Sequence, residues 1–259
     1  MKLLVGSFYS ASTRNSFWHK LKIEYLKHTT KNFDHFVIIT KDVDYTIFDQ
    51  KILKILPSKD IELKIHNQAK SFSQQLEACN FFLEYYRKKE EYDSLLLLDN
   101  TSFPITNNWQ EKLEEEMEDK SYAAPLKTEN FDNFPNCSNF FLKSKDNPLW
   151  NWNFTPDKWI RDLSGKMCLE IGSCIDSKYH FYPLLRSNIY NPHPILAGVY
   201  HDLFYHHGSN DNEISYRSID INNYFKDKFL DHKKIEQELF QYLSKDPQGF
   251  IDHLKNGNL

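Results

Sequence analysis

Short apolar runs alternate along the chain with longer segments in which apolar residues recur every three or four positions. The short runs predict strands at 2–8, 35–40, 51–56, 61–65, 95–99, 121–126, 139–142 and 203–206. The longer segments predict helices at 16–28, 71–89, 107–120, 166–177, 231–244 and 247–255. Strands and helices that alternate in this order predict an α/β protein with a mostly parallel sheet between two helical layers.

Two of these helices have a buried face that the spacing defines. In the helix at 71–89, the stripe consists of Phe72, Leu76, Cys79, Leu83 and Tyr86, and basic residues follow at its C-terminal end. In the helix at 16–28, the stripe consists of Phe17, Leu21, Tyr25 and His28. We therefore expect these side chains to pack against the sheet.

The strand that ends at Asp99 is the most informative one. Four consecutive leucines at 95–98 are followed by Asp99 and by a polar turn that Pro104 closes. A strand that is apolar on both faces belongs inside a parallel sheet with helices on both sides. Open α/β sheets bind ligands at the carboxyl ends of their strands, so Asp99 is predicted to lie at a ligand site. The alternative is that Asp99 only caps the turn.

Composition limits the class of protein. The 259 residues, 40% of them hydrophobic, suffice for one large domain, and the net charge of −4 gives no overall attraction to nucleic acid. The four cysteines lack metal-site spacing and are expected to be reduced core residues. The chain shows no signal peptide and no apolar run of the roughly 18 residues that a membrane helix needs. We therefore expect a cytoplasmic protein with no transmembrane segment.

Three features, in their order along the chain, resemble the GT-A-type glycosyltransferases, the nucleotide-diphospho-sugar transferase fold. They are the first strand with its loop (5–9), the helix at 71–89 that leads into the leucine strand and Asp99, and the segment 200–209, which contains Tyr205-His206-His207-Gly208. The resemblance implies a three-layer Rossmann-like GT-A fold over residues 1–210. Residues 211–259 are expected to be a helical C-terminal extension packed on the same domain.

The resemblance implies transfer of a sugar from a nucleoside-diphosphate sugar, most simply a UDP-sugar, to a hydroxyl acceptor. Asp99 matches the first residue of the family's metal-binding Asp-x-Asp motif, but Thr101 stands where the second carboxylate is usual. Mn²⁺ or Mg²⁺ would then be held by Asp99 with His206 or His207, of which at most one reaches the site if both lie on a strand. Alternatively, a lysine or arginine neutralises the diphosphate without a metal, or catalysis has been lost.

The resemblance also assigns further site residues. The expected donor-binding residues are Ser7, Tyr9, Arg14, Asp99, Asn100 and Thr101. Glu170 is the first choice for a base that activates the acceptor hydroxyl in an inverting enzyme, with Asp162 and Asp176 as rivals. The acceptor could be a glycan, a small molecule or a hydroxymethylated base in phage DNA.

Other classes of protein stay open. A catalytically silent nucleotide-sugar-binding relative is favoured by Thr101, and a different Rossmann-like enzyme, such as a methyltransferase or dehydrogenase, is compatible with the order of elements. No G-x-G-x-x-G motif occurs in the chain, which weighs against dinucleotide binding. The aromatic segment 150–154 either stacks on sugar or base rings or anchors a loop against the sheet.

Overall fold

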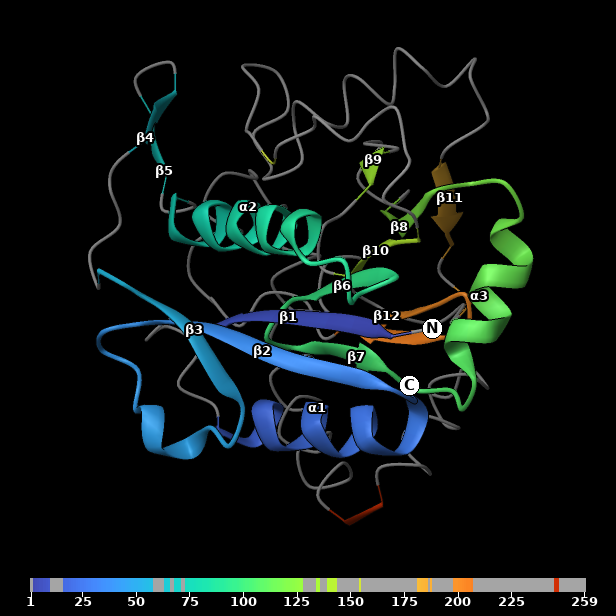
Figure 1. Cartoon of the computed structure of the whole chain (residues 1–259), viewed down its shortest axis with the longest axis horizontal. Helices are drawn as coiled ribbons and strands as arrows, with labels where there is room; N and C mark the ends of the chain where they lie inside the picture. The colour runs from blue at the N-terminus through green and yellow to red at the C-terminus, as the bar shows by residue number, and fades with distance from the viewer. Residues whose placement is uncertain are drawn as a thin grey trace, which may run out of the picture.

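A central sheet with helices on both faces forms the body of the protein (Figure 1). The computed structural model describes residues 2–9, 16–57, 63–65, 68–70, 73–127, 134–135, 139–143, 154, 181–185, 187, 198–206 and 245–246. Within these residues the order of strands and helices confirms the predicted α/β class.

The main sheet is mostly parallel. Its strands, in spatial order, are β11 (Phe181–Leu184), β8 (Tyr122–Lys127), β10 (Asn139–Leu142), β6 (Ser94–Leu98), β1 (Leu3–Tyr9), β2 (Phe33–Thr40) and β3 (Lys51–Leu56), while β9 (Phe134–Pro135) pairs with β8. The neighbours β3, β2, β1 and β6 are parallel, as are β11 and β8. Strand β10 runs antiparallel between β6 and β8.

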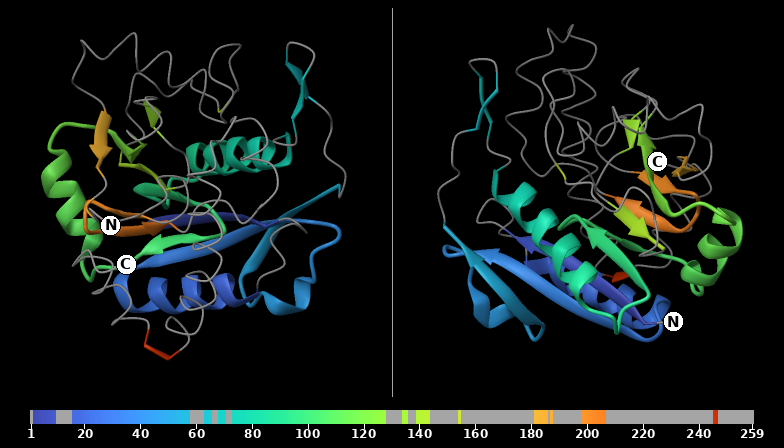
Figure 2. Two further views of the ribbon diagram at one scale, coloured as in Figure 1. Left: turned by 180° about the vertical axis from the view of Figure 1, so that it is seen from behind. Right: turned by 45° about the horizontal axis from the view of Figure 1, so that its top comes forward.

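The helices form the two outer layers. Helix α2 (Ser73–Lys88) covers one face of the sheet, and α1 (Ser16–Thr29) covers the opposite face (Figure 2). On the α1 side lie also α3 (Trp109–Met117) and a small sheet of β12 (Gly198–Tyr200), β13 (Phe204–His206) and β7 (Ser102–Pro104). A short helical turn, η2 (Tyr45–Ile47), and a hairpin of β4 (Leu63–Ile65) and β5 (Gln68–Lys70) complete the described elements.

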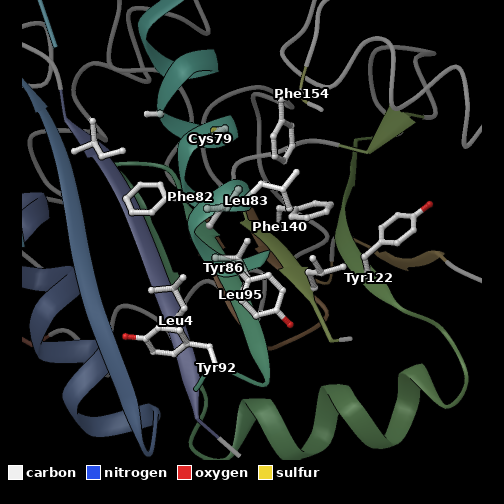
Figure 3. Packing of buried hydrophobic residues seen from close by; sticks show 14 of the residues in the cluster. Leu4, Cys79, Phe82, Leu83, Tyr86, Tyr92, Leu95, Tyr122, Phe140 and Phe154 are labelled. Carbon is white, nitrogen blue, oxygen red and sulfur yellow. The ribbon is translucent and has the colours of Figure 1, made fainter. Parts of the chain in front are cut away.

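The leucine strand β6 is buried on both faces, as its sequence predicts. Leu95 and Leu97 belong to the cluster under α2, which Figure 3 shows with Phe82 and Leu83 of that helix. Leu96 and Leu98 belong to the cluster on the α1 side. Complete burial of one such side chain stabilises the fold by about 1.5–3 kcal/mol. Because its leucines alternate between the two clusters, β6 contributes to the core on both faces of the sheet.

The stripe predicted for α2 is confirmed where the structure describes it. Cys79, Leu83 and Tyr86 are buried, and Leu76 packs at the edge of the same cluster. Phe72 lies outside the described residues. Cys79 is a free thiol in this core, which agrees with the expectation of a reduced cysteine.

The buried face of α1 differs from the predicted stripe. Leu21 and Tyr25 are buried as expected, but His28 is exposed. The side chain of Phe17 is outside the described part of the structure. Two polar residues, His19 and Lys22, point inward instead, with 3% and 0% of their surface exposed. The spacing of apolar residues does not predict this, because it assigns only apolar side chains to the buried face of a helix.

Several predictions concern segments outside the described residues. These segments are the helices at 166–177, 231–244 and 247–255. These helices, and the division of the chain at residue 210, therefore stay predictions. Of the aromatic segment 150–154, only Phe154 is described. It is 1% exposed, and its N–H donates to Asn80 Oδ1 at 2.7 Å, so this residue packs against α2. No helix among the described residues is long and apolar enough to cross a membrane.

The close contact between Gly6 of β1 and Phe82 of α2 leads to a test of the packing. A Cβ atom at position 6 would lie 2.7 Å from Cγ of Phe82. We expect Gly6→Ala to lower the free energy of unfolding, measured in urea, by about 1–3 kcal/mol. In a Phe82→Ala background the same change should cost less, because the shortened side chain has no Cγ atom to meet the methyl group. Equal costs in the two backgrounds would contradict this explanation.

Candidate functional site

Asp99 lies at the carboxyl end of β6, where the sequence places it. It opens a turn that leads into β7, and the N–H of Ser102 donates to the Asp99 carbonyl at 3.2 Å to close this turn. The Asp99 side chain is 26% exposed. A strand buried on both faces thus ends in a carboxylate that a ligand can reach.

His206, the last residue of β13, is distant from Asp99 in the sequence but lies close to its carboxylate. Strand β13 pairs with β7 so that His206 stands opposite Ser102. The His206 Nε2 atom is 3.8 Å from Asp99 Oδ2, and the imidazole is almost fully buried. The structure therefore brings together two of the predicted metal ligands. His207, Arg14 and Glu170 lie outside the described residues, so their roles stay predictions.

The surroundings keep Asp99 ionised. Partial burial would raise the pKa of its carboxyl group, but the nearby His206 imidazole, the charge of Lys22 and the N–H of Thr101 together lower that pKa below its usual value. Thr101 itself is fully buried, whereas Asn100 beside it is partly exposed. At neutral pH Asp99 is consequently ionised.

A buried polar cluster lies next to Asp99. We call it the inner polar cluster, and its members are Ser7, Tyr9, His19, Lys22 and His35 from β1, α1 and β2. The Lys22 ammonium donates to the Asp99 carbonyl oxygen and lies 3.5 Å from Ser7 Oγ. The same nitrogen lies 5.0 Å from the centre of the Tyr9 ring.

Two residues that are predicted to bind the donor, Ser7 and Tyr9, point into this cluster. Ser7 Oγ is 3.0 Å from His35 Nε2, and the Tyr9 hydroxyl is 2.8 Å from His19 Nδ1. Ser7 and Tyr9 are 1% and 4% exposed. Both side chains are therefore buried within the inner polar cluster, and their role in donor binding stays a prediction.

Burial shifts the ionisation of the cluster. It lowers the pKa of Lys22 to about 7, although the Asp99 charge opposes this shift, and it lowers the pKa of His19 to about 4 with help from the Lys22 charge. Burial and the neighbouring cations also lower the pKa of His35, while burial raises the pKa of Tyr9. Both imidazoles are therefore neutral at pH 7 and serve as hydrogen-bonding groups.

Asn139 is a second polar residue at this edge that the sequence did not single out. Leu98 pairs with Ser7 on one side and with Asn139 on the other, so the three side chains point to the same face. Asn139 is 1% exposed, and within the described residues neither of its amide atoms has a hydrogen-bond partner. An unsatisfied buried amide costs about 1–3 kcal/mol, which makes Asn139 a candidate contact for a ligand.

The residues at Asp99 fit part of a divalent-metal site. A carboxylate oxygen and an imidazole nitrogen are ligand types that suit Mn²⁺. No group of three or more His, Cys, Asp or Glu side chains converges among the residues that the structure describes. Asp99 and His206 would thus supply two ligands of such a metal.

The chain matches no protein-family model and no curated protein, but it resembles solved structures in part. One is described as a nucleotide-diphospho-sugar transferase from Desulfovibrio desulfuricans G20, with 9% identity over 71% of this chain and 80% of that chain and a TM-score of 0.42. Another is mouse xyloside xylosyltransferase 1, with 11% identity over 71% of this chain and 84% of that chain and a TM-score of 0.42.

A third is the mannosyltransferase PcManGT from Pyrobaculum calidifontis in complex with GDP-Man and Mn²⁺. The identity is 7%, the alignment covers 55% of this chain and 44% of that chain, and the TM-score is 0.37. The names of these proteins are those of the class that the sequence resembles. The likenesses are too distant to assign an activity to this chain.

The buried His19 leads to a prediction about acid stability. Its pKa falls from 6.5 to about 4 on folding, so between these pH values the unfolded chain binds more protons and stability decreases as the pH falls. We expect His19→Gln to remove up to about 3 kcal/mol of this loss, measured by urea denaturation across the interval. His28→Gln, on the exposed face of the same helix, is the control. An unchanged acid slope in His19→Gln would contradict the prediction.

Proposed function

We propose that this protein is a glycosyltransferase that moves a sugar from a nucleoside-diphosphate sugar, most simply a UDP-sugar, to a hydroxyl acceptor. The observation that carries the proposal is the meeting of Asp99 and His206 at the carboxyl end of the central parallel strand. Nucleotides bind at this end of open α/β sheets, and here the chain presents an ionised carboxylate beside an imidazole.

The chemistry of sugar transfer explains why this pair is suited to the task. When the bond between the sugar and the diphosphate breaks, the nucleoside diphosphate leaves with concentrated negative charge, which the enzyme must neutralise. Mn²⁺ or Mg²⁺ would act as a Lewis acid on that leaving group. Asp99 and His206 would hold the cation, and the lowered pKa of Asp99 would keep its carboxylate ionised for this purpose.

The donor is proposed to lie along the sheet edge between β1 and β10. Ser7 and Tyr9 at the end of β1, and Arg14 after it, would lie near the nucleoside and phosphates, while Asn100 follows Asp99 on the exposed side. Asn139 would offer its amide donor and acceptor to a sugar hydroxyl, a group that also donates and accepts. This placement is supported by the unsatisfied amide of Asn139 next to Leu98.

The acceptor side of the site is proposed from the resemblance alone. Glu170 would accept the proton of the acceptor hydroxyl if the reaction inverts the configuration of the sugar. The acceptor is proposed as a hydroxyl-bearing molecule, whether glycan, small molecule or modified phage DNA base.

A second candidate function is binding of a nucleotide sugar without transfer. It is favoured by the complete burial of Thr101 in the position where the family has a second carboxylate. A hydroxyl that is turned into the core supplies neither the charge nor the exposed oxygen of that carboxylate.

A nucleotide screen tests both candidates. We expect UDP to raise the thermal midpoint of the protein more in the presence of Mn²⁺ than in its absence, because Asp99 and His206 would hold the cation and its charge would favour the diphosphate. GDP and CDP serve as comparisons for the base. Hydrolysis of a UDP-sugar would support the transferase, and a shift without hydrolysis of any donor would support the silent relative. The absence of a shift with any nucleotide would contradict both.

Asp99→Asn tests the role of the carboxylate while nearly preserving its shape. We expect the fold to be retained and donor hydrolysis to fall at least about 100-fold, because the leaving group loses its charge stabilisation. Asp119→Asn, an exposed carboxylate beyond α3, is the matched control and should keep the wild-type rate. Wild-type hydrolysis in Asp99→Asn would remove Asp99 from the mechanism.

A further inference from the structure

We propose that Lys22 is a positioning residue of this site, which fixes the turn at residues 99–102 and so determines where the Asp99 carboxylate and the His206 imidazole meet. The inference rests on the proposed function, because it assigns Lys22 to the donor site at Asp99. It concerns a helix that the expected site residues do not include.

Lys22 occupies a place in α1 where an apolar residue would be expected. It lies in the middle of the inward face of the helix and has no exposed surface. An ammonium group in such a place loses its hydration, which costs free energy unless hydrogen bonds within the protein replace the lost water. A role in packing alone would therefore be served better by a leucine or methionine.

The partners of Lys22 show what its ammonium group does. It donates to the Asp99 carbonyl, approaches Ser7 Oγ at 3.5 Å and lies over the Tyr9 ring. Lys22 thus joins three parts of the chain: helix α1, strand β1 and the turn after β6. Because the side chain is fully buried, it acts through Asp99 and not by touching a ligand.

The Asp99 carbonyl is the point at which the geometry of the pair is set. It accepts hydrogen bonds from Ser102 N–H at 3.2 Å and Ser102 Oγ at 3.3 Å in addition to Lys22. Ser102 begins β7 and pairs directly with His206 on β13. A shift of this carbonyl would therefore move the Asp99 side chain at one end of the turn and the strand that carries its partner at the other.

Lys22→Met removes the ammonium group and keeps an unbranched side chain of similar length. We expect this variant to fold with a lower thermal midpoint than the wild type, because the Asp99 carbonyl loses one donor while both Ser102 donors remain. We also expect it to bind UDP in the presence of Mn²⁺ about tenfold more weakly, measured by calorimetry. Lys20→Met, on the exposed side of the same helix, is the matched control and should bind as the wild type does.

The His206 imidazole gives a readout that needs no ligand. Its ¹⁵N resonances report the distance and orientation of the Asp99 carboxylate, and we expect them to move in Lys22→Met and to stay in place in Lys20→Met. If Lys22→Met does not fold, Lys22→Gln, which retains a shorter polar donor, allows the same comparison.

The outcomes separate this inference from the proposed function. Unchanged His206 resonances in the Lys22 variant would overturn the positioning role. Moved resonances with unchanged UDP affinity would overturn its relevance to the site. A wild-type protein that binds no nucleotide would count against the proposed function, and the resonances would still decide whether Lys22 positions the pair.

Discussion

The burial of β6 on both faces is the constraint on which the rest of the structure depends. A strand enclosed by two helical layers has no side chain along its length that can meet solvent, because each residue faces one of the two cores. Polar chemistry can begin only where the strand ends, at Asp99. The turn after Asp99, the small sheet and the inward residues of α1 all lie around this end of β6.

The sequence predicted the elements that local patterns define. Strands β1, β2, β3, β6 and β10 and the three main helices lie where alternation and helical spacing indicate, because their apolar residues determine both the local structure and the burial. The small sheet was not foreseen as a unit. Strand β7 has only three residues, and its pairing with β13 joins segments about a hundred positions apart, which no short window contains.

The site was predictable only in part, for the same reason. Asp99 was singled out from its strand and His206 from a resemblance, and the structure places these two side chains together. Lys22, His19 and His35 were missed because polar residues in a helix or strand are expected to face water. Their burial is a tertiary effect: a polar site needs polar neighbours beneath it, and the residues that supply them break the apolar pattern.

Strand β10 has a further consequence because it runs against its neighbours. At the edge where β1, β2 and β6 end, β10 begins with Asn139, which pairs with Leu98. A parallel strand in this place would have had its carboxyl end, and not its first residue, at this edge. The inversion puts the first residue of β10, Asn139, at the edge that carries Asp99, so a substitution at Asn139 can change the chemistry of this edge while the order of the strands stays the same.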